Sequence, residues 1–359
     1  MADKPTLLRI LERARWAPSG DNTQPWRFEI VDDEHLVVHG FDTRDHVVYD
    51  LDGHSSQLAV GALLETIAIA ATVEGLGCQI ERRPDAPETH LLIDVRFDRS
   101  EGLVPDHLAP FIEKRVVQRR PMSTRPLTVE QKERLTAALP EGYSVVWFAG
   151  WRERFRMARL MFDNAKIRLN IPEAYRVHKA VIEWGAQFSE DKIPSRAVGV
   201  DHFTEHVMRW AMASWERIEF LNKWMLGDLG PRIQLDLMPG ILCAAHFGLL
   251  APGPLRTVDD YLAAGRAVQR MWLTATSLGL HIQPEMTPVI FSRYHRAGLK
   301  FSAVPWAASR VAQLNHSLES RLQGGSLDQL FFLGRLGISR PPSARSTRKG
   351  LTSFLSGHG

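Results

Sequence analysis

A loop near the N-terminus carries side chains suited to a flat ligand with a polar edge. It reads Ala-Pro-Ser-Gly-Asp-Asn-Thr-Gln-Pro-Trp-Arg-Phe over residues 17–28. A proline such as Pro18 can flatten a loop against an apolar ring. Ser19, Asn22 and Gln24 offer hydrogen-bond donors and acceptors to the edge of that ring. An ordinary asparagine-capped turn with a packed tryptophan is the alternative reading of this pattern.

A second group of residues is suited to a phosphate. Residues 114–122 read Lys-Arg-Val-Val-Gln-Arg-Arg-Pro-Met, and two more arginines stand at Arg345 and Arg348. Arginine makes charge-assisted, often bidentate bonds to phosphate oxygens. The net charge of the chain is only +3, so these local clusters favour a small anion over nucleic acid or an anionic membrane. A solvated basic turn is the alternative for residues 114–122.

Regular elements are expected on both sides of these motifs. Hydrophobic periodicity and turn residues predict, in the first part of the chain, helices over 7–16 and 55–74 and strands over 27–31, 35–38, 78–81 and 91–97. In the second part they predict helices over 128–139 and 257–278, a helical stretch over 152–229 and strands over 144–148, 241–250, 280–283 and 329–334. Both long helices end in Leu-Gly before a strand. This weak repetition suggests two related halves.

The first loop resembles the APS-xx-N-x-QPW-x-F segment of FMN-dependent nitroreductases. Residues 115–119 resemble the arginine element that grips the FMN phosphate in this family, although Val117 stands where Ser or Thr is usual. Residues 278–284, Leu-Gly-Leu-His-Ile-Gln-Pro, resemble the segment over the flavin N5 region, and residues 345–351 resemble the closing basic motif. The cofactor-binding residues that this resemblance implies are Pro18, Ser19, Asn22, Gln24, Arg115, Val117, Arg119, Gln283, Pro284, Arg345 and Arg348. It implies no metal ligand and identifies no catalytic side chain.

The order of the motifs resembles a tandem, single-chain subgroup of the family. The loop comes first and the arginine element about 90 residues later, as in actinobacterial nitroreductase-like proteins and ThiF-associated nitroreductases. This resemblance implies an α+β nitroreductase-like fold, with a central mainly antiparallel sheet flanked by helices and two pseudo-symmetric halves in one chain. We expect repeat one over 1–112, repeat two over 113–340 with a helical lid over 151–239, and a basic tail over 341–359, of which at least the end is mobile.

The activity implied by the resemblance is electron transfer through FMN. NAD(P)H would be the donor and a nitroarene, quinone or unsaturated compound the acceptor. Two alternatives remain: a flavin-holding protein with little turnover, and a flavin-dependent oxidase or dehydrogenase working with a ThiF-type adenylating partner. The chain would be a monomer, itself a pseudo-dimer, or a homodimer.

Other features bear on location and on competing chemistry. The two cysteines have no CxxC partner, no signal-peptide pattern opens the sequence, and the apolar runs 58–71 and 240–252 fall short of the ~20 residues of a membrane span. We therefore expect a cytoplasmic protein. Residues 202–206 match HxxEH, a zinc-binding pattern, although a polar helix face is the more ordinary interpretation. A polar loop near the cofactor is expected over residues 39–46.

Overall fold

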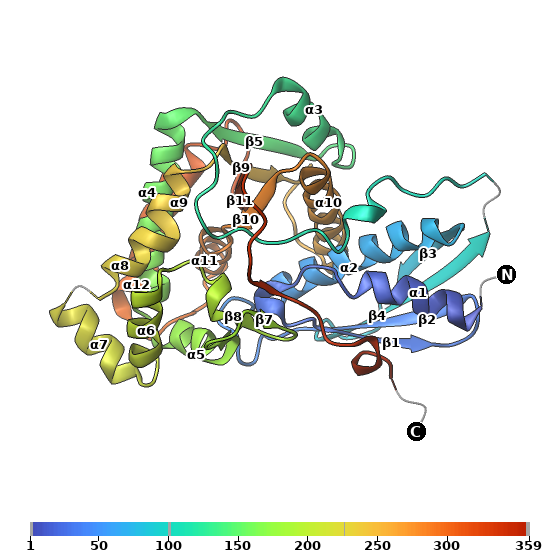
Figure 1. Cartoon of the computed structure of the whole chain (residues 1–359), viewed down its shortest axis with the longest axis horizontal. Coiled ribbons are helices and arrows are strands. Elements are labelled where there is room, and N and C mark those ends of the chain that lie inside the picture. Colours follow the sequence, from blue (N-terminus) through green and yellow to red (C-terminus); the bar gives the residue numbers. More distant parts are fainter. Residues whose placement is uncertain (1–2, 100–101, 226, 357–359) are drawn as a thin grey trace.

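The N-terminal half forms an antiparallel sheet beside two helices (Figure 1). A computed structural model describes residues 3–99, 102–225 and 227–356. The elements of this half are α1 (Lys4–Ala14), β1 (Trp26–Ile30), β2 (His35–Phe41), α2 (His54–Val73), β3 (Leu76–Arg82) and β4 (His90–Arg99). The strands lie in the order β1-β2-β4-β3, and every pair of neighbours is antiparallel.

The C-terminal half repeats this topology. Its elements are α3 (Val129–Ala137), β5 (Ser144–Ala149), β9 (Ala245–Leu250), α10 (Val258–Ser277), β10 (His281–Pro284) and β11 (Leu330–Gly337). Its sheet has the order β5-β9-β11-β10, again antiparallel throughout, with its long helix between the second and third strands as in the first half. The predicted α+β class is confirmed, but the antiparallel strands divide between two sheets instead of one central sheet.

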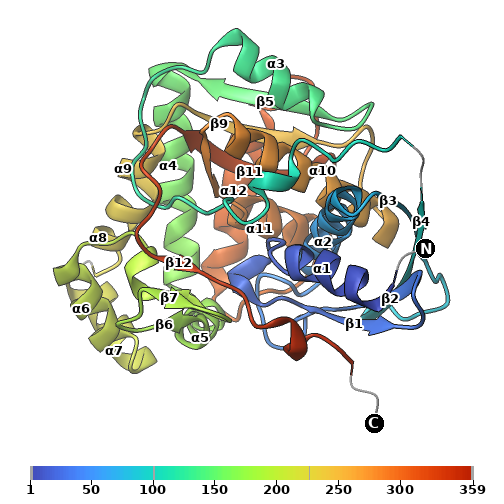
Figure 2. The same cartoon turned by 45° about the vertical axis from the view of Figure 1, so that its right-hand side comes forward.

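The two halves meet through their long helices, α2 and α10, which pack against each other between the sheets (Figure 2). The contact depends on one glycine in each helix. A Cβ added to Gly61 would lie 2.1 Å from the Leu262 carbonyl oxygen, and one added to Gly265 would lie 2.1 Å from the Leu58 carbonyl oxygen. Only glycine allows two backbones to approach this closely. The small residues of both helices therefore have a packing role.

Helix α2 is longer than the apolar run that the sequence suggested. With 20 residues and a mean hydropathy of 1.6 in its most apolar window, it has the length and composition of a membrane span, yet 83% of that window is buried inside the protein. It packs on α1, α10 and the first sheet. These contacts are those of a core helix.

A helical insertion separates β5 from β9. It contains α4 (Gly150–Leu169), α5 (Pro172–Val181), β6 (Ile182–Glu183), β7 (Phe188–Ser189), β8 (Ile193–Pro194), α6 (His202–Ala211), α7 (Trp215–Trp224), α8 (Leu229–Arg232) and α9 (Met238–Ile241). Helix α4 belongs to the core, because Met157, Leu160 and Met161 pack in a cluster with β5, β9 and β11. The helices α11 (Thr287–Arg296) and α12 (Pro305–Glu319) lie between β10 and β11 in the sequence and pack together near α4.

One predicted strand starts too early. Residues 241–250 were expected to be extended, but α9 occupies Met238–Ile241 and β9 begins at Ala245. Pro239 lies in the first turn of α9, where its fixed φ favours the helix. The apolar character of the segment did not separate the buried helical turn from the buried strand.

The described part of the C-terminal tail is held against the rest of the protein. It runs back across the molecule from β11 to the first sheet (Figure 1). Its β12 (Arg345–Ser346) pairs with β7, and the backbone of Phe28 donates to the Phe354 carbonyl at 2.7 Å. Phe354 is fully buried against Trp26 and Phe28, which holds the tail in place. Residues 357–359 lie outside the described residues.

Candidate functional site

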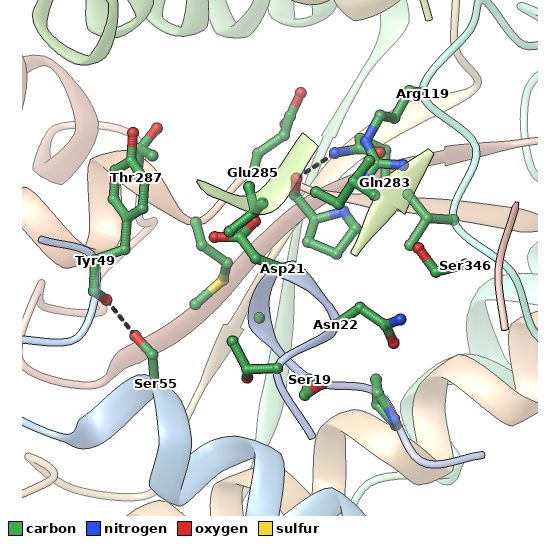
Figure 3. Close-up of a pocket in the computed structure, with 18 of the residues that line it drawn as sticks. Ser19, Asp21, Asn22, Tyr49, Ser55, Arg119, Gln283, Glu285, Thr287 and Ser346 are labelled. Atoms are coloured by element: carbon green, nitrogen blue, oxygen red, sulfur yellow. Dashed lines mark hydrogen bonds between the residues drawn. The ribbon is translucent and has the colours of Figure 1, made fainter. Parts of the chain in front are cut away.

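A cavity of about 480 Å³ opens where the two halves, the insertion and the tail meet (Figure 3). Its walls come from segments far apart in the sequence, among them 18–23, 43–62, 115–119, 283–290 and 344–348. Ten of the eleven residues predicted to bind the cofactor line it: Pro18, Ser19, Asn22, Arg115, Val117, Arg119, Gln283, Pro284, Arg345 and Arg348. Gln24 is the one that does not. The fold thus gathers the predicted residues around one space, while their role in binding stays a prediction.

The first loop is held in an unusual conformation by its own polar side chains. Asp21, Asn22 and Gln24 have positive φ values of 49°, 64° and 51°, which non-glycine residues seldom adopt. The Asn22 Nδ2 donates to the Glu190 carbonyl at 3.0 Å, and the Gln24 Nε2 donates to the same carbonyl at 2.8 Å. These two side chains fasten the loop to the insertion, so their hydrogen-bonding groups are already used within the protein.

Ser19 remains available to a ligand. Its Oγ accepts a hydrogen bond from the backbone N–H of Gln24 at 3.0 Å. A hydroxyl that accepts in this way still carries a proton to donate. Of the three polar residues predicted for the ring edge, Ser19 is the one that keeps a free donor at the cavity.

Three arginines cluster at one end of the cavity. The Arg115 Nη2 donates to the Trp16 carbonyl at 2.9 Å, the Arg348 Nη2 to the Ala17 carbonyl at 2.9 Å, and the Arg345 Nη1 to a backbone carbonyl at 3.0 Å. Arg348 also donates to the Asn22 Oδ1 at 2.8 Å. Their acceptors are carbonyl and amide oxygens instead of carboxylates. The cluster therefore brings three positive charges together with no negative charge among these acceptors.

The arginine cluster is electrostatically costly for the protein alone. Arg115 is 4% exposed and Arg348 is 8% exposed. Burial, together with the neighbouring arginines, lowers the pKa of Arg115 well below its ordinary value and that of Arg348 to about 9. Desolvation and like charges both disfavour the charged forms. A bound anion would offset both effects, and the Nε atoms of Arg115 and Arg345 have no partner among the described residues.

Arg119 does not join this cluster. Its Nη1 donates to the Ala197 carbonyl at 3.3 Å, which places the side chain against the insertion. Asp21, also on the cavity wall, is the charged group that faces it: burial raises the pKa of Asp21, and the Arg119 charge opposes that shift. Asp21 occupies a variable position of the loop pattern, so the resemblance did not single it out.

The arginine element continues as an extended segment beside β10. Val117 forms a parallel bridge with Ile282, and the Gln118 N–H donates to the Ile282 carbonyl at 3.1 Å. Val117 packs on the second-half core. At the neighbouring Gln283, the Nε2 donates to the Pro284 carbonyl at 2.9 Å, while the Oε1 has no partner among the described residues. Gln283 therefore offers an open acceptor to the cavity.

A second polar group, which the sequence did not reveal, stands on the opposite wall. The Tyr49 hydroxyl lies 2.9 Å from the Nε2 of His178, and the Arg168 Nη2 donates to Asp236 at 2.7 Å. Figure 3 places Tyr49 and Thr287 across the cavity from Arg119 and Gln283. No local pattern could signal this group, because its members come from a loop, two helices and a helical turn that meet only in the fold.

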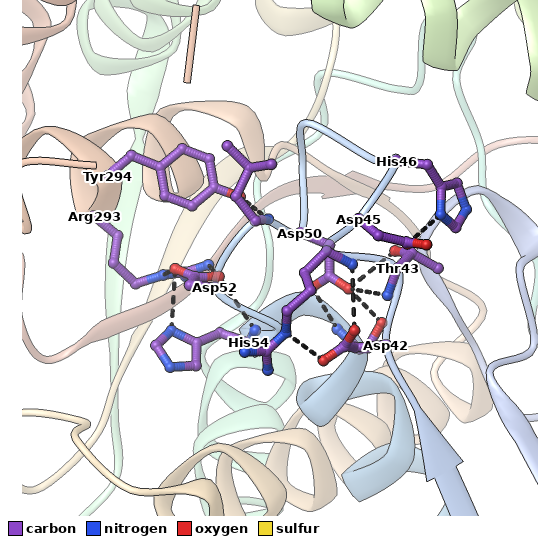
Figure 4. A network of polar contacts seen from close by, with 12 residues as sticks. Asp42, Thr43, Asp45, His46, Asp50, Asp52, His54, Arg293 and Tyr294 are labelled. Atoms are coloured by element: carbon purple, nitrogen blue, oxygen red, sulfur yellow. Dashed lines mark hydrogen bonds and ion pairs between the residues drawn. The ribbon is translucent and has the colours of Figure 1, made fainter. Parts of the chain in front are cut away.

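The loop that carries Tyr49 is fixed by a polar network (Figure 4). The Asp50 carboxylate accepts from the backbone and hydroxyl of Thr43 at 3.0 and 2.9 Å and from the Ser56 hydroxyl at 2.6 Å. Burial raises the pKa of Asp50 against these bonds. Asp52 pairs with Arg293 at 2.9 Å, and this bond and one from His54 outweigh burial and hold the pKa of Asp52 below its ordinary range.

The HxxEH segment lies on α6 as an exposed polar face. The His206 Nδ1 donates to the His202 carbonyl at 2.7 Å, and Glu205 accepts from the Ser195 hydroxyl. Within residues 3–99, 102–225 and 227–356, no three His, Cys, Asp or Glu side chains are grouped as metal ligands would be. Both cysteines are free thiols: Cys243 is buried and Cys78 is half-buried.

Comparison with known proteins finds a family match for the N-terminal part of the chain. Residues 3–55, which include the first loop, match the sequence model of the nitroreductase family. The uncharacterized protein MT1398 of Mycobacterium tuberculosis is 24% identical over 350 residues, which are 96% of this chain and 47% of that protein. The chain therefore spans about half the length of this curated relative.

Two solved structures are similar to this chain at lower sequence identity. A nitroreductase-like family protein from Bacillus cereus is 12% identical, with a TM-score of 0.35 over 70% of this chain and 96% of that one. A mutant of NfnB, an FMN and NADPH-dependent nitroreductase from Sphigopyxis sp. strain HMH, is 16% identical, with a TM-score of 0.36 over 70% of this chain and 99% of that one.

Proposed function

We propose that the protein is an FMN-dependent oxidoreductase that passes electrons from NAD(P)H to a small organic acceptor, a nitroarene, a quinone or an unsaturated compound. The observation that carries this proposal is the buried arginine cluster at one end of an otherwise largely apolar interface cavity. A cavity with one strongly cationic end suits a ligand that joins a phosphate to a flat ring. The family match over residues 3–55 supports a flavin as that ligand.

Unpaired buried polar atoms around the cavity fit FMN. They are the Nε atoms of Arg115 and Arg345, the Trp272 Nε1 and the Gln283 Oε1, none of which has a partner among the described residues. Buried polar atoms are nearly always hydrogen-bonded in native proteins. The two guanidinium groups suit phosphate oxygens, and the indole N–H and the amide oxygen suit the polar edge of an isoalloxazine ring.

The residues of this chain would bind and orient the cofactor. Arg115, Arg345 and Arg348 would hold the phosphate, Ser19 and Gln283 would hydrogen-bond the ring, and Pro18 would lie against its face. Bound FMN would supply the hydride chemistry of the reaction, accepting a hydride from NAD(P)H and delivering it to the acceptor. The insertion would exclude water from the ring, because Met208 and Met212 of the segment after β8 line the cavity.

A flavin-holding protein with little turnover is the second candidate. The observation in its favour is the contact of Asn22 and Gln24 with the Glu190 carbonyl, which closes the insertion over the loop. A closed insertion would keep nicotinamide away from the ring. A ThiF-type partner stays a prediction of the family resemblance, and a cytoplasmic location stays a prediction of the sequence pattern.

The first test is the visible absorption spectrum of the purified protein, followed by identification of the released cofactor. We expect the two-band spectrum of oxidised flavin, with FMN near one equivalent per chain, and bleaching by NADPH under anaerobic conditions. Bound FMN without bleaching by NADPH or NADH would favour the flavin-holding candidate. A colourless protein that fails to bind added FMN would refute both.

A further inference from the structure

We propose that the cavity wall formed by Tyr49, His178 and Arg168 is the acceptor subsite, and that the Tyr49 hydroxyl hydrogen-bonds the oxygen of a quinone. This inference rests on the proposed flavin function and adds the residue that recognises the second substrate. None of these three residues belongs to the motifs that resemble the nitroreductase pattern. Their placement is a product of the fold.

The subsite is separate from the arginine cluster that would hold the phosphate. Tyr49 comes from the loop before α2, His178 from α5 and Arg168 from the end of α4, and all three line the cavity. Figure 3 shows Tyr49 on the wall opposite Gln283 and Ser346. A ligand whose phosphate occupied the arginine cluster would leave this wall to a second molecule.

The Tyr49–His178 pair can serve both redox forms of a quinone. Burial, with the nearby Arg168 charge, lowers the pKa of His178 to about 3, so the imidazole is neutral at physiological pH. A neutral imidazole either donates or accepts at Nε2, depending on its tautomer. When Nε2 donates to Tyr49, the phenol proton is free for a quinone carbonyl. When Nε2 accepts, the phenol oxygen is free to accept from a hydroquinone hydroxyl.

The rest of the wall suits a flat apolar ring. Met208, Met212 and Ile290 line the cavity, and methionine side chains adapt to ring-shaped ligands. The Arg168 Nη2 is paired with Asp236, so the pair places little net charge beside an uncharged acceptor. The Arg168 guanidinium adds a dipole that favours negative charge developing on the quinone oxygen.

The step balances with solvent as the second proton source. The quinone gains two electrons and one proton as a hydride from reduced flavin, which NAD(P)H has supplied. Its second oxygen-bound proton comes from solvent, and hydroquinone leaves. Tyr49 keeps its own proton throughout, because burial raises the pKa of its phenol well above the ordinary range. It is a binding residue and not an acid in this step.

The test measures the binding of 1,4-naphthoquinone to the purified full chain by quenching of tryptophan fluorescence. Tyr49→Phe removes one hydrogen bond and little volume, and we expect it to raise the dissociation constant of naphthoquinone about tenfold. In anaerobic stopped-flow experiments, it should slow flavin reoxidation by naphthoquinone more than flavin reduction by NADPH. Tyr143→Phe is the matched control, because Tyr143 packs on Phe331 outside the cavity. It should leave the dissociation constant unchanged.

A second variant tests whether Tyr49 recognises the quinone or only links its loop to the insertion through His178. His178→Leu removes the partner of the Tyr49 hydroxyl but leaves that hydroxyl in place, so naphthoquinone affinity should fall, and clearly less than in Tyr49→Phe. Equal losses in the two variants, or a wild-type dissociation constant in Tyr49→Phe, would overturn the proposal. The binding titration needs no electron transfer. It therefore tests the subsite even if NADPH fails to reduce the protein, which would refute only the proposed oxidoreductase function.

Discussion

Replacing Arg115 by methionine should weaken FMN binding and at the same time stabilise the protein without cofactor. The side chain is 4% exposed, lies over the Trp272 ring at 4.8 Å and makes one hydrogen bond, to the Trp16 carbonyl. Its neighbours Arg345 and Arg348 carry the same charge. In the absence of an anion, the buried charge of Arg115 is therefore opposed by desolvation and by repulsion.

The effects on FMN affinity and on the stability of the cofactor-free protein have opposite signs, and the size of each can be estimated. A hydrogen bond from a charged donor contributes about 1.5–3 kcal/mol, so its loss should raise the dissociation constant of FMN roughly 10- to 150-fold. Replacing a buried ion pair by apolar side chains of similar volume is often neutral or stabilising by about 1–4 kcal/mol, and Arg115 has no carboxylate acceptor that its replacement would leave unpaired. The lost bond to the Trp16 carbonyl costs about 1 kcal/mol. We expect the cofactor-free variant to be more stable by about 0–3 kcal/mol.

Flavin fluorescence quenching would give the dissociation constant, and urea unfolding of the cofactor-free protein would give the stability. Arg340→Met is the matched control, because Arg340 is an exposed arginine of the same tail that bears Arg345. It should change neither quantity. If Arg115→Met lowered the stability of the cofactor-free protein while FMN affinity stayed at the wild-type value, Arg115 would be a structural residue and the argument for a phosphate site would fail.

Three further predictions concern the packing of α2 on α10, a buried ion pair and the closure of the insertion. Gly61→Val should lower the free energy of unfolding by about 3 kcal/mol or more, since its Cβ would lie 2.1 Å from a backbone carbonyl oxygen of α10. A loss of less than about 1 kcal/mol in urea unfolding would contradict this packing. The ion pair with Glu285 outweighs burial and raises the pKa of His246 to about 10. Because this pKa is higher in the folded than in the unfolded protein, protonated His246 stabilises the fold fully below about pH 6.5, and this stabilisation is lost as the pH rises through 10. The free energy of unfolding should therefore fall from about pH 7 to 10, and less steeply in His246→Gln. Parallel pH profiles for the two proteins would refute the assignment. Asn22→Ala removes a bond to the Glu190 carbonyl, so limited proteolysis should cut residues 185–199 faster than in wild type; an unchanged rate would show that this bond does not hold the insertion closed.

Local sequence signals predicted most elements closely. The helix expected over 128–139 is Val129–Ala137, and the Thr128 hydroxyl caps it by accepting from the Gln131 N–H in a capping box. The helix expected over 257–278 is Val258–Ser277. Such signals succeed because caps, terminal glycines and hydrophobic periodicity act within a few residues. They gave no position for the tail, since that position depends on the distant partners of Phe354.

It was harder to predict what each side chain does at the site than to predict which residues line the cavity. Asn22 and Gln24 were expected to meet the ring, but their amide groups bind the insertion and the tail. The resemblance could not foresee this, because the Glu190 carbonyl that they share comes from an insertion with no recognisable motif. Arg119 likewise turns to the insertion instead of the arginine cluster.

The sequence by itself indicated a resemblance to nitroreductases, the α+β class and ten of the residues that line the cavity. These follow from short motifs whose chemistry is carried within about ten residues. Only the tertiary structure decided that the antiparallel strands form two sheets, that the tail closes on the first of them, and that Tyr49, His178 and Arg168 share a wall. The last two depend on contacts between segments more than 100 residues apart, such as the bond between Tyr49 and His178, and no local pattern encodes such a contact.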